Sequence, residues 1–133
     1  MVGTARVLDA LRAGCHTRVG GKRTSDVEKL LASGERWLLA AQHADGGWGM
    51  GNAATVEETA LAVIALSGGD ARCESAARRG CAWLVGKTGR ERERAAPIGL
   101  YFSLLWYHER LYPLAWALEA LGLNVTKEVE HVG

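Results

Sequence analysis

The segment WLLAAQHADGGWG, residues 37–49, links one helix to a turn of unusual composition. An amphipathic helix ends at Gln42, and a glycine turn carrying Trp48 follows it. Glycine adopts the conformations of tight turns without steric cost, so Gly46 and Gly47 are suited to closing this turn. A helix that ends in glutamine and closes through Gly-Gly-Trp is more specific than an ordinary helix end. We therefore interpret the flanking sequence as further copies of one helix–turn–helix unit.

Helical periodicity lies on both sides of this segment. Ser25-x-x-Glu28 has the form of a capping box, and the helix that it opens carries one apolar stripe. Thr55-x-x-Glu58 is a second capping box, and it opens a helix over residues 57–67 that is apolar all round. A helix without a polar face is buried on every side, which predicts inner helices covered by outer ones. The stripe of the first helix comprises Val27, Leu30, Leu31, Gly34, Trp37, Leu38 and Ala41.

The unit repeats along the chain. Residues 4–11 match residues 59–66 at an offset of 55, and the same offset leads to residues 114–121. Gly34-x2-Trp37-Leu38 also recurs as Gly80-x2-Trp83-Leu84 within a helix expected over residues 71–86. A period near 50 residues with two helices per unit is typical of helical-hairpin arrays. We therefore predict an all-α fold without strands, a helical domain over 1–123 and a polar tail over 124–133.

Composition excludes several classes of function. The formal net charge of +1 gives no electrostatic footprint for nucleic acid. Cys15, Cys73 and Cys81 form no Cys-x-x-Cys pair, and the four histidines show no metal-ligand spacing, so we expect neither a metal site nor a cofactor. No charged leader with an apolar run and no stretch of 18 apolar residues is present. We expect a cytoplasmic protein, or one peripheral to a membrane.

The spacing Gly34-x2-Trp37-Leu38-x3-Gln42-x3-Gly46-x-Trp48 resembles the QW motif of the squalene-hopene cyclase and oxidosqualene cyclase superfamily. It lacks only the basic residue before the glycine. Residues 4–8, 97–102 and 109–114 resemble the same region of bacterial members, in collinear order. The resemblance covers nearly all of residues 3–122. It implies about half of an (α/α)6 barrel built of inner and outer helix hairpins, corresponding to the C-terminal part of such an enzyme.

The resemblance also implies an activity of the isomerase class. Class II terpene cyclases protonate a linear polyprenyl substrate, such as squalene or a diphosphate diterpene precursor, and cyclise it without a cofactor. Their acid is an Asp-x-Asp-Asp motif, which this sequence lacks. We therefore expect the chain alone to be inactive. An apolar half barrel would associate with itself or with a missing N-terminal half.

Glu57 and Glu58 are the candidates for a catalytic acid. Val56-Glu57-Glu58-Thr59-Ala60 mirrors the Val-Asp-Asp-Thr-Ala form of the family's acid motif. Protonating an alkene requires a carboxylic acid that its surroundings keep neutral. However, Glu58 completes a capping box, and both carboxylates suit the positive end of a helix dipole. We favour the capping role.

Aromatic residues near the C-terminus are candidates for the substrate pocket. Aromatic faces stabilise carbocations through the ring quadrupole, and the resemblance implies that this block lines the cavity. Tyr101, Trp106 and Tyr107 are the residues that we expect there, with core packing as the alternative. The resemblance gives Gln42, Gly46 and Trp48 a structural role, in which the glutamine ties the turn to the next helix.

Two other functions remain open. The chain could be a non-catalytic helical-hairpin module that binds a partner chain or an apolar ligand. It could also be one half of a split cyclase whose other half is encoded separately. Turnover of a polyprenyl substrate by the isolated chain would separate these hypotheses.

Overall fold

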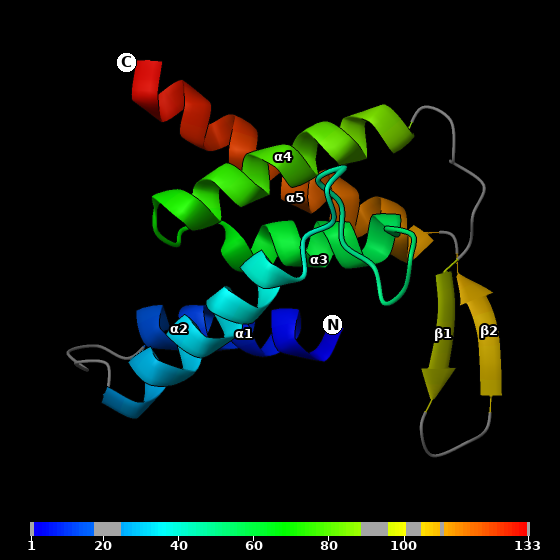
Figure 1. Ribbon diagram of the computed structural model, residues 1–133, viewed down its shortest axis with the longest axis horizontal. Coiled ribbons are helices and arrows are strands. Elements are labelled where there is room, and N and C mark those ends of the chain that lie inside the picture. Colours follow the sequence, from blue (N-terminus) through cyan, green and yellow to red (C-terminus); the bar gives the residue numbers. More distant parts are fainter. Residues whose placement is uncertain (1, 18–24, 89–95, 101–104, 110, 133) are drawn as a thin grey trace.

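The computed structural model describes residues 2–17, 25–88, 96–100, 105–109 and 111–132. These residues form five α-helices and one antiparallel hairpin (Figure 1). The predominantly helical class is therefore as predicted. The helices are α1 (Val2–Thr17), α2 (Ser25–Ala40), α3 (Val56–Leu66), α4 (Ala71–Thr88) and α5 (Leu111–Val132), and the strands are β1 (Ala96–Leu100) and β2 (Leu105–Glu109).

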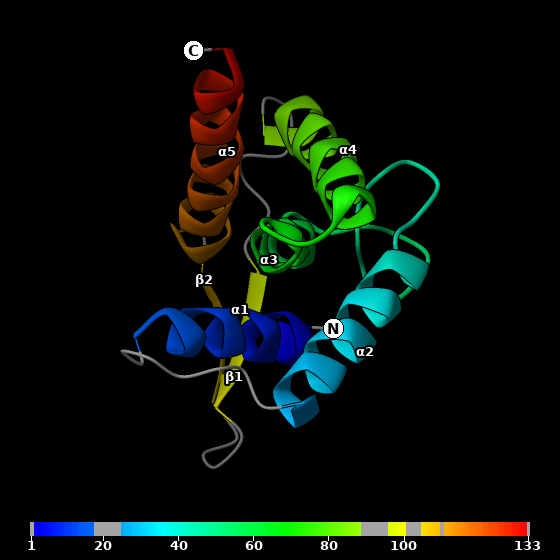
Figure 2. The same cartoon turned by 90° about the vertical axis from the view of Figure 1, so that its left-hand side faces the viewer.

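The helix α3 lies at the centre of the fold. It packs against α1, α4 and α5, and Figure 2 shows it nearly end-on with these three helices around it. The helix α2 packs mainly on α1 and also touches α3 and α4. In chain order the helices therefore alternate between a row of α1, α3 and α5 and a second row of α2 and α4. The sequence predicts inner helices covered by outer ones, and α3 is the helix whose residues from Thr59 to Leu66 are all buried.

The composition of α3 explains its position. Every residue from Thr59 to Leu66 is buried, and Thr59 is the one polar side chain among them. Burying one Leu, Ile or Val side chain stabilises a fold by about 1.5–3 kcal/mol relative to leaving it exposed. The prediction that this all-round apolar helix is covered on every side is confirmed. Small residues on the neighbouring helices, including Ala76, Ala117 and Ala120, are buried against the same core.

The hairpin corrects the expectation that the chain contains no strands. β1 and β2 pair in antiparallel register from Ala96 opposite Glu109 to Leu100 opposite Leu105. A short apolar run of this kind has no periodicity that separates strand from helix. Its aromatic residues favour a strand, and Pro97 is tolerated because each strand of a two-stranded sheet is an edge. Figure 1 shows the hairpin beside one end of the helical assembly.

Two helices continue through glycines that could have ended them. The helix α1 continues past Gly14 to Thr17, and α5 continues past Gly122 and Asn124 to Val132. A glycine inside a helix costs only about 1 kcal/mol, which tertiary contacts can offset. The Asn124 amide donates to the carbonyl of Ala120 at 3.0 Å and to the Ser67 hydroxyl at 3.4 Å. The bond to Ser67 attaches this part of α5 to the end of α3.

Pro113 lies in the first turn of α5, as predicted, where its missing N–H group costs nothing. Within the described ranges, no helix has both the length and the hydropathy needed to cross a membrane.

Candidate functional site: the turn from Gln42 to Trp48

The turn after α2 is closed by its own backbone. The amide of His43 donates to the carbonyl of Gly47, and the amide of Gly46 donates to the carbonyl of His43, both at 2.9 Å. Gly46 has a φ of 94°, a region that residues with a Cβ atom rarely occupy. A Cβ atom at this position would also lie only 3.0 Å from the carbonyl oxygen of Arg79. Both reasons require glycine here.

Gln42 joins this turn to α4. Its amide nitrogen donates to the carbonyl of Gly46 at 2.9 Å and to the carbonyl of Ala76 at 3.0 Å. Its amide oxygen accepts a hydrogen bond from the guanidinium of Arg79. One glutamine thus uses both donors and its acceptor to connect the end of α2 with the first half of α4. A shorter Asn side chain would not span the same partners.

Asp45 makes a second connection to α4. One carboxylate oxygen accepts from the amide of Gly47 at 3.1 Å, and the other accepts from the indole nitrogen of Trp83 at 2.9 Å. These hydrogen bonds, the Gly47 amide first, hold the pKa of Asp45 below its ordinary value of 3.8. The ring of Trp83 also packs closely against the turn, since a Cβ atom at Gly47 would lie 2.8 Å from its Cε2 atom.

Trp48 is fully buried beneath this turn. Its indole nitrogen donates to the carbonyl of Leu38 at 2.8 Å. Its backbone amide donates to the hydroxyl of Thr59 at 2.9 Å, and that hydroxyl donates to the Trp48 carbonyl at 3.3 Å. Thr59 is therefore the buried polar residue of α3 because it binds the backbone of the turn. This tryptophan contacts the outer row and the central helix together.

Gly80 makes the close packing around Trp48 possible. A Cβ atom at this position would lie 2.5 Å from Cγ2 of Val63 and 2.7 Å from Cζ3 of Trp48. Real Cβ contacts are not this short, so α4 approaches α3 and the indole only with glycine at this point. Gln42, Gly46 and Trp48 thus close the turn and fasten it to the helices around it, and their assignment to a QW motif stays a prediction.

Glu58 caps α3 in the predicted manner. The Thr55 hydroxyl accepts from the amide of Glu58 at 3.2 Å, and it also donates to the Glu58 carboxylate at 3.2 Å. The second partner of that carboxylate is the amide of Met50 at 3.0 Å, whereas the amide of Thr55 donates to Trp48. The Thr55 cap of α3 is confirmed. In the usual capping box the Glu58 carboxylate would accept from the Thr55 amide, but here it accepts from the Met50 amide.

Glu57 lies beside Glu58, and both residues are partly buried. Burial raises the pKa of the Glu57 carboxyl above its ordinary value of 4.5. The charge of Glu58 adds to this rise in pKa, and the charge of Arg6 opposes it. The Arg6 guanidinium itself lies 5.0 Å from the ring centre of Trp116 on α5. A carboxyl, a cation and an aromatic ring from α3, α1 and α5 are therefore near one another.

The predicted pocket residues belong to the hairpin region. Tyr101 lies outside the described residues. Trp106 and Tyr107 belong to β2, opposite Gly99 and Ile98 of β1. The pocket-lining role of these three residues stays a prediction.

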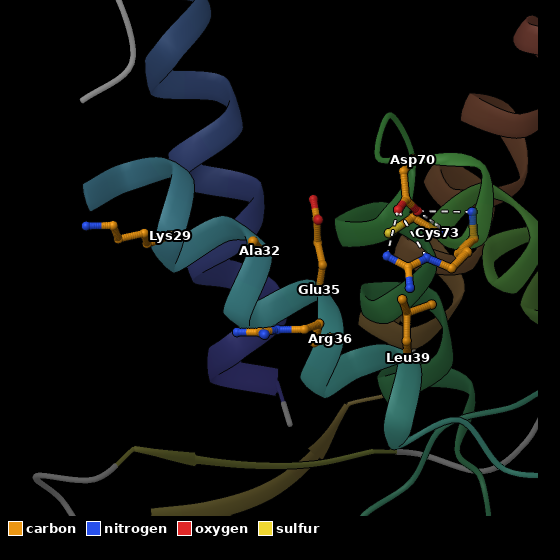
Figure 3. Close-up of a pocket in the computed structure, with 8 residues that line it drawn as sticks. Lys29, Ala32, Glu35, Arg36, Leu39, Asp70 and Cys73 are labelled. Atoms are coloured by element: carbon orange, nitrogen blue, oxygen red, sulfur yellow. Dashed lines mark hydrogen bonds and ion pairs between the residues drawn. The ribbon is translucent and has the colours of Figure 1, made fainter. Parts of the chain in front are cut away.

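A separate pocket of about 330 Å³ lies between α2 and the start of α4 (Figure 3). Asp70 caps α4 by accepting from the amides of Arg72 and Cys73, and it forms an ion pair with the Arg72 side chain at 3.1 Å. Cys73 is only 1% exposed, and burial is the main cause that raises its pKa to about 11. This thiol stays protonated near neutral pH, so the pocket offers no reactive nucleophile.

Sequence reasoning missed three residues that build the turn. Asp45 lies in the turn itself, whereas Thr59 binds it from α3 and Arg79 binds it from α4. An Asp before Gly-Gly is a common start of an Asx-turn, and that signal points to Asp45. A lone threonine in an otherwise apolar helix is the equivalent signal for Thr59. The partner that each side chain binds follows only from the packing of the helices.

No family model and no solved structure matches the chain. It is 42% identical over 86 residues to an uncharacterized protein from Bradyrhizobium diazoefficiens. It is also 43% identical over 87 residues to an uncharacterized protein from Sinorhizobium fredii. Each match covers 64% of this chain and 16% of the relative. The chain thus spans about a sixth of the length of the curated relatives that it matches.

Proposed function

We propose that this chain is the C-terminal part of a class II terpene cyclase, in which it forms part of an (α/α)6 barrel. The complete enzyme would protonate and cyclise a linear polyprenyl substrate, either squalene or a diphosphate diterpene precursor. The chain itself would supply barrel wall and cavity lining. It would be inactive alone, since the resemblance places the Asp-x-Asp-Asp acid upstream of this region.

The connection that Gln42 makes to α4 carries the proposal. The resemblance implies a glutamine that ties the turn to the next helix, and the Gln42 amide donates to the carbonyl of Ala76 on α4, the second helix after the turn. The alternation of α1, α3 and α5 with α2 and α4 supports a barrel of helix hairpins. A relative about six times the length of the matched segment leaves room for the remaining hairpins.

Within this proposal, the residues near the start of α3 have separate roles. Glu58 binds Thr55 and Met50, so we assign it to capping rather than to proton transfer. Glu57 is half-buried with a raised pKa, yet at neutral pH it requires much deeper burial to serve as an acid. The aromatic residues Tyr101, Trp106 and Tyr107 would face the carbocation intermediates.

A chimeric enzyme tests the proposal. The matched segment of the Bradyrhizobium relative would be replaced by the corresponding residues of this chain. The intact relative, the chimera and the isolated chain would each be incubated with squalene and with geranylgeranyl diphosphate. We expect cyclised products from the relative and the chimera, and none from the isolated chain. Gas chromatography with mass spectrometry would identify them.

Three outcomes would contradict the proposal or its assignments. Absence of cyclised product from the intact relative with both substrates would remove the activity on which it depends. Turnover by the isolated chain that Glu57→Gln or Glu58→Gln abolishes would overturn the structural assignment of these carboxylates. An active relative with an inactive but folded chimera would show that this chain has left the enzymatic role, which favours the non-catalytic module.

A further inference from the structure

An apolar groove of about 480 Å³ lies between α1 and α2. Its lining includes Val7, Leu30 and Trp37, which are 57%, 60% and 47% exposed. Leu30 and Trp37 belong to the stripe that predicts the buried face of α2, whereas only Leu31 and Leu38 of that stripe are fully buried. The exposed half of the stripe therefore needs an explanation.

The internal repeat relates this groove to a region that is covered. Gly34 of α2 matches Gly80 of α4, and Leu8 of α1 matches Val63 of α3. A Cβ atom at Gly34 would lie 2.7 Å from Leu8, just as one at Gly80 would lie 2.5 Å from Val63. The pair α1–α2 thus repeats the close contact of the pair α3–α4. Figure 2 shows these two pairs side by side.

In the second pair, the matching surface is covered by the turn from Gln42 to Trp48. Residues Ala76, Arg79, Gly80 and Trp83 of α4 match Leu30, Ser33, Gly34 and Trp37 of the groove. Gln42 binds the carbonyl of Ala76 and the side chain of Arg79, and Asp45 binds the indole of Trp83. Trp83 is 8% exposed as a result, against 47% for Trp37.

The inner helix of each pair also carries a threonine at the matching position. Thr59 of α3 binds the backbone amide and carbonyl of Trp48, and its counterpart Thr4 of α1 lines the groove. The groove therefore contains three of the elements that receive the turn in the second pair: a glycine for close approach, a tryptophan to be covered and a threonine for the backbone. Ser33 stands where the second pair has Arg79.

We propose that this groove is the receptor for a further Gln-x3-Gly-x-Trp turn, carried by a helical repeat that this chain does not contain. A second copy of the chain is a poor source, because its own Trp48 is fully buried and its Gln42 is engaged by α4. The relatives are long enough to hold such a repeat, since the match covers 16% of their length. The inference depends on the internal repeat and not on the proposed activity.

A tandem fusion tests this docking. Residues 25–55 would be duplicated directly before Met1, because Met1 matches Val56 and the added turn then has its native spacing to α1. We expect the Trp37 indole N–H to exchange with solvent more than about tenfold more slowly, since a covered indole exchanges only after local opening. Nuclear magnetic resonance would follow the indole signals, with Trp37→Phe to assign the one from Trp37.

The matched control is the same fusion with Gln42→Ala and Trp48→Ala in the added copy alone. It should leave Trp37 exchange as in the original chain. A second measurement uses Thr4→Val, which should leave the urea midpoint of the original chain unchanged and lower that of the fusion. The proposal would be overturned by equal Trp37 exchange in fusion and control, or by a Thr4→Val effect that is equal in both backgrounds. No substrate is involved, so the result is independent of the cyclisation assay.

Discussion

The indole nitrogen of Trp48 donates a hydrogen bond to the carbonyl oxygen of Leu38, 2.8 Å away. Leu38 lies in the last turn of α2, where carbonyl groups lack partners within the helix. The tryptophan that ends the turn therefore folds back beneath the helix that precedes the turn. Both residues are fully buried, so the bond is shielded from water. This contact makes the turn part of the core and not a surface loop.

Removing the Trp48 side chain should strongly destabilise the fold. Trp48→Ala is expected to lower the free energy of unfolding by about 3–5 kcal/mol, because it leaves a cavity beneath Gly80 and α3. Trp48→Phe fills most of that volume but removes one of the two hydrogen bonds that the Leu38 carbonyl accepts, the other coming from the Ala41 amide at 3.2 Å. We expect this variant to lose about 0.5–1.5 kcal/mol. Urea denaturation followed by circular dichroism measures both. The control is Trp37→Ala, for which the half-exposed side chain predicts a loss below about 1 kcal/mol.

Two glycines of α4 should respond oppositely to alanine. Gly80→Ala introduces a methyl group within 2.7 Å of both Val63 and Trp48, so we expect a loss of about 1–3 kcal/mol. Gly86 lies in the same helix and has no atom within 4 Å of the position of a Cβ atom. Gly86→Ala should therefore stabilise by up to about 1 kcal/mol through helix propensity. Equal responses in thermal unfolding would contradict the packing around Gly80.

Asp45 should make stability fall in acid. Because its pKa in the folded protein is below the ordinary value of 3.8, the folded state favours the ionised form. Its contribution is present above the unfolded pKa and is lost as pH falls through the folded pKa. Asp45 is exposed, so solvent screening keeps the effect below about 1 kcal/mol.

The measurement for Asp45 is the difference in urea midpoint between the original chain and Asp45→Asn, at pH 7 and at pH 3. The difference should shrink at pH 3, because that pH is below the ordinary value of 3.8 at which the carboxyl of the unfolded chain gains a proton. Asp70 also has a lowered pKa, but it is common to both proteins and cancels in this comparison. A difference that is constant with pH would show that the charge of Asp45 contributes nothing.

The effect of Glu57 on the pH dependence of stability should be opposite to that of Asp45. Its raised pKa means that the folded state favours the protonated form, so stability is lost as pH rises from the ordinary value of 4.5 through the folded pKa. Glu57→Gln should therefore stabilise the chain at pH 7, by a few tenths of a kcal/mol after allowance for solvent screening. Below pH 4 the two proteins should unfold at the same temperature.

Glu58, the neighbouring residue, supplies the control for the Glu57→Gln variant. Glu58→Ala removes a carboxylate that binds Thr55 and Met50, so we expect a loss of about 1 kcal/mol at pH 7. Calorimetry at both pH values would measure the two variants together. A destabilisation by Glu57→Gln as large as that by Glu58→Ala would mean that Glu57 also has a structural partner.

Much of the candidate site could be predicted from local chemistry. The Thr55-x-x-Glu58 spacing specified a helix cap, and the cap formed because its partners are three residues apart. Gly46 and Gly47 predicted a tight turn, and the positive φ of Gly46 agrees. The hairpin could not be predicted in the same way. Its strands pair Ile98 with Tyr107, and such pairing is not visible in the periodicity of either segment.

The sequence by itself determined the helical units, the burial of α3 and the position of the turn, because these depend on periodicity, capping and glycine. The tertiary structure decided which contacts those units make. It brought Asp45 to Trp83 and Thr59 to Trp48, pairs that lie on different elements. It also left Trp37 half exposed while burying Trp83. Periodicity identifies the apolar face of a helix, but only the presence of a neighbouring repeat decides whether that face is covered.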